Sequence, residues 1–172
     1  MKESDKTNES ASPDIAPDSR GLLKVNAIKN GTVIDHIPSQ QLFRVIEILG
    51  LDGGKDQITF GMNLESRRLQ SKAIIKVTNR FFEDDDVNRI TLVAPHAKLN
   101  IIRNYEVAEK RPLALPEEIR GIAKCVNPKC VTNNEAIETR FKVSKTEKGF
   151  MLTCHFCEKT TDNQNLKIVR KT

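Results

Sequence analysis

Residues 25–50, VNAIKNGTVIDHIPSQQLFRVIEILG, change at Pro38 from an alternating to a helical pattern of apolar side chains. The alternation before the proline predicts an extended strand, and Gly31 predicts a kink or bulge within it. After the proline, apolar residues at helical spacing predict an amphipathic helix over residues 39–49, which ends at Gly50. The apolar residues of this helix are Leu42, Phe43, Ile46 and Leu49. The chain therefore begins its fold with a strand followed by a helix that packs on it.

The chain downstream of this stretch adds two strands, a helix and a strand. Residues 57–64 place apolar side chains at alternate positions, and residues 73–78 are apolar and β-branched, so the two segments predict a hairpin. The acidic run at residues 83–86 predicts the first turn of a helix that ends before Pro95, because carboxylates there interact favourably with the helix dipole. Residues 98–107 return to extended character. The order βαββαβ predicts an α+β fold, a ferredoxin-like antiparallel sheet with two helices.

All the cysteines of the chain lie in its last third, as two close pairs. The four residues are Cys125, Cys130, Cys154 and Cys157. Four thiolates at this spacing suit one tetrahedral zinc ion, and a site without an open position is structural, not catalytic. A four-cysteine iron centre uses similar spacing and stays open as an alternative, as do four unrelated buried cysteines. We expect His155, which lies between two of these cysteines, to be a surface residue.

The composition divides the chain into four segments. Residues 1–20 are polar and nearly devoid of large apolar side chains, which predicts a disordered tail. Residues 21–111 form the βαββαβ domain, and residues 112–119, with Pro112 and Pro116, form a semi-rigid linker. Residues 120–172 are too few for a self-sufficient core, so they predict a small all-β domain that depends on the metal. The chain shows no signal-peptide pattern and no apolar run of membrane-spanning length, so we expect a cytoplasmic protein.

The positive charge of the chain leaves open the hypothesis that it binds nucleic acid. The formal net charge is +5, and a four-cysteine module is typical of zinc ribbons, so a zinc-ribbon nucleic-acid-binding protein is the alternative function. Against it, the chain has one tyrosine and no tryptophan to stack on bases. It also has no nucleophile motif, no phosphate-binding glycine loop and no clustered histidines, so we expect no catalytic residues. A binding or regulatory role is therefore favoured over an enzyme.

Three motifs in one order resemble the regulatory chain of aspartate carbamoyltransferase. They are residues 25–38, VNAIKNGTVIDHIP; residues 104–107, NYEV, followed by Lys110 and the pair Arg111-Pro112; and the two cysteine pairs. The similarity runs from about residue 22 to residue 168. The resemblance implies a non-catalytic regulatory subunit of pyrimidine biosynthesis, whose residues 21–111 are an allosteric effector domain for CTP or ATP.

The resemblance also implies an effector-binding residue set. In that family, the segment at residues 25–28 frames the base through its backbone, Asp35 lies near the ribose and His36 near phosphate. Lys76 matches a lysine that reaches base and ribose, and Lys110 one that neutralises the triphosphate. Asn26 departs from the acidic residue expected at its position. The complete implied set is Val25, Asn26, Ala27, Ile28, Val33, Asp35, His36, Ile74, Lys76, Asn100, Ile102, Tyr105, Val107 and Lys110.

The partners implied by the resemblance are protein chains and nucleoside triphosphates. The effector domains would form a homodimer, and the zinc domains would contact catalytic trimers in a heterododecamer of six catalytic and six regulatory chains. Residues 126–129, next to the first cysteine, are the candidate contact. No nucleic acid and no membrane are expected as partners.

Overall fold

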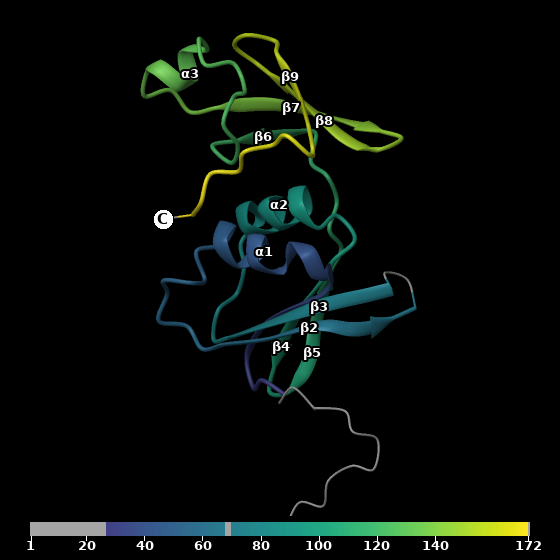
Figure 1. Cartoon of the computed structure of the whole chain (residues 1–172). Helices are drawn as coiled ribbons and strands as arrows, with labels where there is room; N and C mark the ends of the chain where they lie inside the picture. The colour runs from purple at the N-terminus through teal and green to yellow at the C-terminus, as the bar shows by residue number, and fades with distance from the viewer. Residues whose placement is uncertain (1–26, 68–69, 172) are drawn as a thin grey trace, which may run out of the picture.

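The computed structural model describes residues 27–67 and 70–171, which form two sheets with two helices between them (Figure 1). The first sheet and its helices, the five-stranded part, contain β1 (Gly31–Pro38), a 3-10 turn (Ser39–Gln41), α1 (Leu42–Ile48), β2 (Ile58–Ser66), β3 (Gln70–Thr78), α2 (Asp84–Val93), β4 (Lys98–Arg103) and β5 (Glu106–Arg111). The second, the four-cysteine part, contains β6 (Glu118–Arg120), α3 (Val131–Asn134), β7 (Arg140–Thr146), β8 (Gly149–Cys154) and β9 (Thr160–Asp162).

The five-stranded sheet has the order β2-β3-β1-β4-β5, with every neighbouring pair antiparallel. Its first four strands have the ferredoxin-like arrangement that the sequence predicts, since each helix connects two strands that lie one strand apart. One face of the sheet packs on α1 and α2 through side chains such as Ile34, Ile75 and Leu99, all buried. Among the described residues, no helix covers the other face (Figure 1).

The prediction of a strand over residues 98–107 is wrong, because the chain turns back within this segment. β4 and β5 form a hairpin whose turn has Asn104 at φ 51° and Tyr105 at φ 68°. The Tyr105 N–H donates to the Lys29 carbonyl at 2.9 Å, and the Asn104 N–H donates to Asn30 Oδ1 at 3.0 Å. These bonds hold the left-handed turn in place. Tyr105 is accordingly 63% exposed.

Two apolar residues expected in the core are exposed. Phe43 of α1 is 59% exposed, and Phe60 of β2 is 47% exposed. Phe60 pairs with Ile75 and so faces the helices, where its ring meets that of Phe43 on α1. Because β2 is the edge strand, this aromatic pair lies at the margin of the core. A register shift between Gly61 and Leu64 then breaks the period-two pattern of β2. The buried residues of the first helix and the turn that ends it are instead Leu42, Val45, Ile48 and Leu49.

The second helix begins and ends where the sequence predicts. α2 begins after Glu83, which pairs with Asp86 in a capping box, and its first turn carries three aspartates. It ends one residue before Ala94, ahead of Pro95. None of the helices within residues 27–67 and 70–171 is long and apolar enough to cross a membrane.

The four-cysteine part is a four-stranded antiparallel sheet with the order β6-β7-β8-β9. Its core includes Phe141, Phe150 and Leu152, together with the cysteines and Leu92 of α2. The domain is all-β except for the four-residue α3. The apolar run at residues 166–169 is not a strand, because it makes only an isolated bridge between Ile168 and Ala123. β6 starts at Glu118, so this sheet includes the last residues of the expected linker.

Candidate metal centre and effector site

The four cysteine thiols converge on one point. All four Sγ atoms lie within 4.8 Å of one another, with Cys125 and Cys157 3.5 Å apart and Cys130 and Cys154 3.8 Å apart. Four sulfurs at about 2.3 Å from a central zinc ion lie about 3.8 Å from one another, by tetrahedral geometry. The thiols therefore have the spacing of a tetrahedral four-sulfur site.

Backbone and side-chain donors surround the sulfurs, as metal-bound thiolates require. The Asn127 N–H points at Cys125 Sγ, 3.4 Å away, and Thr132 Oγ1 donates to Cys130 Sγ at 3.3 Å. The Asn133 side chain donates to the carbonyls of Cys125 and Asn127, which fixes the loop between the first two cysteines. The loop is thus rigid before any partner contacts it.

The pKa values of the thiols also bear on how the site binds a metal cation. Burial raises the pKa of the Cys125 thiol to about 12, which outweighs the hydrogen bond from the Asn127 N–H. Burial acts in the same direction on Cys157, but the Lys159 N–H and the Asn127 side chain outweigh it and bring the pKa of that thiol to about 7. Four adjacent thiolates cannot coexist without a positive charge, so metal binding must release protons. His155 is exposed and lies with its ring 5.2 Å from that of Phe156, outside the donor set.

The uncovered face of the five-stranded sheet brings several predicted effector residues into one row. Lys76 of β3 pairs with Val33 of β1, Val33 pairs with Asn100 of β4, and Asn100 pairs with Lys110 of β5. Directly paired residues in an antiparallel sheet point to the same face, so the four side chains share the face opposite the helices. Burial lowers the pKa of the Lys76 ammonium. The row has a lysine at each end.

A second group lies two residues along β1 from this row. Lys72 Nζ donates to both carboxylate oxygens of Asp35, at 3.0 and 3.2 Å. The His36 N–H donates to Asp35 Oδ1 at 2.7 Å, and its Nδ1 lies 3.0 Å from Oδ2. Burial raises the pKa of Asp35, but the bonds from Lys72 and His36 outweigh it and leave that pKa below its ordinary value of 3.8. Asp35 therefore carries a negative charge at neutral pH.

Lys72 was not among the residues predicted from the sequence. The alternation of side chains along β3 could have identified it. Lys72, Ile74 and Lys76 lie on one face of the strand, and the buried Ala73 and Ile75 lie on the other. A residue two positions before a predicted site residue on the same strand shares its face.

The remaining predicted effector residues lie around the β4–β5 turn or outside the residues that the structure describes. The bonds from Asn104 and Tyr105 to Asn30 and Lys29 place the segment after Ala27 and Ile28 beside this turn. Val107 is exposed and pairs with the buried Ile102. Val25, Asn26 and the tail at residues 1–20 lie outside the described residues.

The Asp35–Lys72 pair gives a pH prediction. Because the pKa of Asp35 is depressed, its contribution to stability is present above the unfolded pKa and is lost as pH falls through the folded value, below 3.8. Lys72→Met should raise the pKa of Asp35, so that this loss begins at higher pH. The measurement is an NMR titration of the Asp35 carboxyl carbon, with Lys98→Met, opposite Asp35 on β4, as the matched control. An unchanged pKa in Lys72→Met contradicts the assignment.

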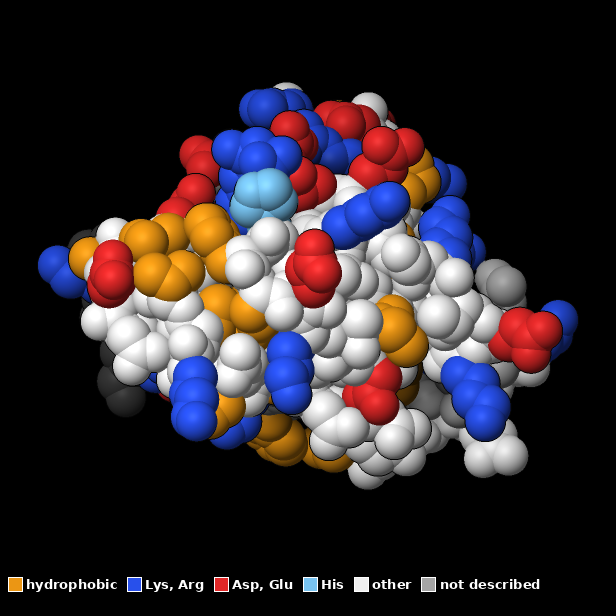
Figure 2. Space-filling model, turned by 90° about the horizontal axis from the view of Figure 1, so that it is seen from above, with side chains coloured by type: hydrophobic (Ala, Val, Ile, Leu, Met, Phe, Trp, Pro, Cys, Tyr) orange, Lys and Arg blue, Asp and Glu red, His pale blue; other side chains and the backbone are white. Residues whose placement is uncertain are grey.

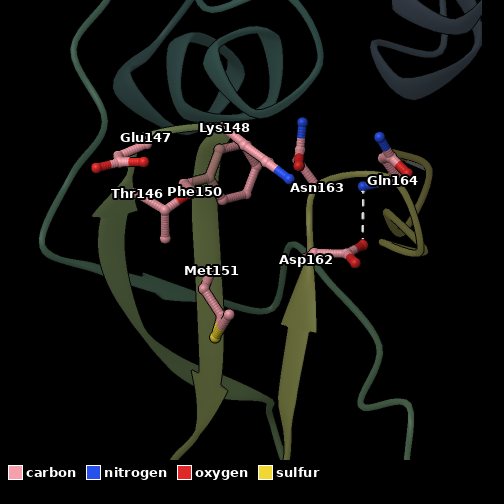
Figure 3. A pocket seen from close by; sticks show the side chains of 8 residues that line it. All are labelled: Thr146, Glu147, Lys148, Phe150, Met151, Asp162, Asn163 and Gln164. Atoms are coloured by element: carbon pink, nitrogen blue, oxygen red, sulfur yellow. Dashed lines mark hydrogen bonds between the residues drawn. The ribbon is translucent and has the colours of Figure 1, made fainter.

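A hollow of about 610 Å³ opens at the tip of the β7–β8 hairpin (Figure 3). Phe150 and Met151 contribute apolar surface, while Glu147, Lys148 and Asp162 contribute charges of both signs. The Gln164 N–H donates to Asp162 Oδ1 at 3.0 Å and shapes the loop on one side. We assign no catalysis to it.

The four-cysteine part also presents apolar side chains to solvent, in patches separated by charged residues (Figure 2). Val126 follows the first cysteine, and Phe156 lies between the last two; both are exposed. Because the thiols converge, these two loops are held close together. Exposed apolar side chains on a rigid support are typical of a protein contact.

Comparison with known proteins matches both parts of the chain. Residues 23–114 match the family model "Aspartate carbamoyltransferase regulatory chain, allosteric domain", and residues 117–167 match its "metal binding domain". A regulatory chain of that enzyme from Phocaeicola vulgatus is 53% identical over 152 residues, 88% of this chain and 97% of the relative. Those of Bacteroides fragilis (49%, covering 88% and 99%) and Pyrococcus horikoshii (47%, covering 84% and 95%) are also similar. One structural zinc ion is the cofactor that the matched metal-binding domain and its four thiols indicate.

Proposed function

The chain belongs to the family of aspartate carbamoyltransferase regulatory chains, and on that premise we propose that it binds CTP and ATP and transmits their binding to catalytic chains. It is a regulatory subunit, so the chemistry of pyrimidine biosynthesis takes place on its partner. We assign the effector domain to residues 21–111, the linker to residues 112–119 and the zinc domain to residues 120–172. Four reduced cysteines that hold a metal suit the cytoplasm, where we place the protein.

The row of Lys76, Val33, Asn100 and Lys110 is the observation that carries the effector proposal. A nucleoside triphosphate has its charge at one end and its base at the other, so a face with lysines at both ends and a neutral middle suits its length. Lys110 would pair with the phosphates by charge-assisted hydrogen bonds. Lys76, whose pKa is lowered by burial, would contact the ribose and base.

The base would be selected by backbone groups. The carbonyls and N–H groups after Ala27 lie next to the β4–β5 turn, because Lys29 and Asn30 accept hydrogen bonds from Tyr105 and Asn104. Backbone carbonyls of Ala27 and Ile28 would accept hydrogen bonds from the exocyclic amine of cytosine or adenine and would disfavour a base with a keto oxygen at that position. Such contacts would select CTP and ATP as the effectors.

The zinc domain would contact the catalytic chain. The metal fixes the loop at residues 126–129 and the loop at Phe156, and both expose apolar side chains. A rigid apolar surface loses little conformational entropy when a partner covers it. We therefore assign the contact with catalytic trimers, in a heterododecamer, to these two loops.

A second copy of the chain would cover the edge of the five-stranded sheet. Phe43 and Phe60 stack edge to face at 6.0 Å and are both exposed, together with Met62 on β2. β2 is an edge strand, and an apolar edge is a liability unless another chain covers it. Phe60→Asp should convert a homodimer to monomers in sedimentation equilibrium, whereas Phe81→Asp, whose ring lies under Arg103 of β4, should not. Equal masses for both variants would refute this interface.

Calorimetric titration of the zinc-loaded chain with CTP and ATP tests the effector site. Lys110→Ala should weaken both triphosphates about 10- to 100-fold, because each charged hydrogen bond contributes about 1.5 to 3 kcal/mol. Lys76→Ala should also change the ratio of CTP to ATP affinity. Lys145→Ala, on β7, is the matched control and should have no effect. Unchanged affinities in both site variants would remove the assignment. Salt-sensitive binding of a random oligonucleotide without nucleotide binding would favour the zinc-ribbon alternative.

A further inference from the structure

The last described residues of the chain, residues 166–171, leave the four-cysteine part and run down to the level of α1 and α2 (Figure 1). We call them the C-terminal strap. Its first half belongs to the four-cysteine part: the Val169 N–H donates to the Ile122 carbonyl at 2.7 Å, and the Lys167 carbonyl accepts from the Lys124 N–H at 2.9 Å. The strap is thus anchored at one end beside the cysteines.

Both ends of the strap bind α1. The Lys171 N–H donates to the Ile48 carbonyl at the end of the helix, at 3.2 Å, and Arg44 donates to the Leu166 carbonyl at 2.8 Å. Gly50, at φ +62°, makes room for it, because a Cβ there would lie 2.8 Å from the Lys171 carbonyl oxygen. The strap therefore uses a carbonyl at the end of α1 that the helix itself leaves unpaired.

The strap also binds α2, through a buried carboxylate and a buried guanidinium of that helix. Lys171 Nζ lies 2.8 Å from Oδ1 of Asp86, a residue only 2% exposed, whose Oδ2 accepts the Glu83 N–H. Arg89, 7% exposed, donates to the Val169 carbonyl. A buried carboxylate that loses its cation is costly, so Asp86 strongly favours the docked position of Lys171.

An apolar contact in the middle of the strap joins the same two parts. Ile168 packs against the core of the five-stranded part and also against the core of the four-cysteine part. Leu92, which lies on α2 of the five-stranded part, likewise packs in the core of the four-cysteine part, the second core. The polar bonds at the ends of the strap thus flank a shared hydrophobic contact.

We propose that the C-terminal strap is a clasp that fixes the four-cysteine part on α1 and α2, with the Lys171–Asp86 pair as its closing contact. While the clasp is closed, the two helices and the four-cysteine part move as one body. When Lys171 is released, the strap leaves α1 and α2, and the described residues then join the two parts only through the segment between β5 and β6 and the contact of Leu92 with the second core. The charge at residues 171 and 86 therefore sets how firmly the domains are coupled, whether or not a nucleotide is bound.

Amide hydrogen exchange and residual dipolar couplings on the full-length, zinc-loaded chain, without nucleotide, test this proposal. Lys171→Met should speed exchange of the amide at residue 171 about tenfold relative to the wild type, through local opening of the strap. One alignment tensor should fit both parts of the wild type, and two should be needed for the variant. Lys167→Met removes the same charge from the same segment, away from α2, and should behave as the wild type does.

Asp86→Asn is a second variant, needed because Lys171→Met leaves Asp86 buried and unpaired and could unfold the chain for that reason alone. The asparagine keeps an oxygen that can accept the Glu83 N–H but lacks the charge, so it should also release the strap. In a double-mutant cycle, the combination with Lys171→Met should open the strap no further than either single change. Exchange and alignment in Lys171→Met and Asp86→Asn equal to those in Lys167→Met would overturn the proposal. Because no nucleotide is present, this outcome is separate from a failure of effector binding.

Discussion

Cys154→Ser is expected to unfold the four-cysteine part, residues 120–171, while the five-stranded sheet stays folded. Structural zinc typically supplies about 10 to 16 kcal/mol at neutral pH, most of the folding free energy available to so small a domain. Cys154 ends β8 and is fully buried, so its loss removes both a ligand and part of the core. A strong chelator should have the same effect on the unaltered chain.

Zinc content and NMR chemical-shift dispersion measure this effect. Thr153→Ser, the neighbouring position on β8, is the matched control and should keep both its zinc and its dispersion. Native-like dispersion of residues 120–171 in Cys154→Ser, without bound metal, would show that the metal is not the source of stability.

Gly31→Ala is expected to destabilise the five-stranded part by about 3 kcal/mol or more, from backbone strain and a steric clash together. Gly31 begins β1 at φ +137°, a conformation that alanine rarely adopts. A Cβ there would also collide with the Val77 carbonyl oxygen and lie 3.0 Å from the Asn79 nitrogen, both of them backbone atoms of or next to β3. The neighbouring strand cannot move aside without breaking its pairing with β1.

Urea denaturation of the zinc-loaded chain measures the cost. Gly53→Ala is the matched control, because the nearest atom to its added Cβ is the end of the Arg170 side chain at 3.4 Å. The same variants should separate in nucleotide affinity, since Gly31 follows the segment that we assign to the base. Equal unfolding free energies for the two variants would contradict the strain at Gly31.

The sequence predicted the parts of the fold whose signals are local. The Pro38 boundary, the acidic start of α2 and the spacing of the cysteines each depend on residues close together in the chain, and each is confirmed. The exposure of Phe60 is different, because it depends on β2 being the edge strand of the sheet. Alternation within the strand carries no information on which strand lies at the edge.

The candidate effector site shows the same division. Four of the residues that the family resemblance implies share one face, because period two on each strand and the pairing between strands place them there: Lys76, Val33, Asn100 and Lys110. Lys72 was missed because its partner, Asp35, is on a different strand, so their contact depends on the β1–β3 register. The β4–β5 turn was missed because its left-handed residues are held by Lys29 and Asn30, far away in sequence.

The central claim is that a metal-rigidified domain passes nucleotide occupancy to another polypeptide. It is tested most directly by mixing the zinc-loaded chain with catalytic trimers of aspartate carbamoyltransferase and following carbamoyl transfer at subsaturating aspartate, with and without CTP or ATP. We predict that the trimers bind the chain and that their activity then changes with nucleotide. Lys110→Ala should bind the trimers equally well but respond only at higher nucleotide concentrations. Trimers that ignore the chain, or bind it and stay indifferent to both nucleotides, would contradict the account.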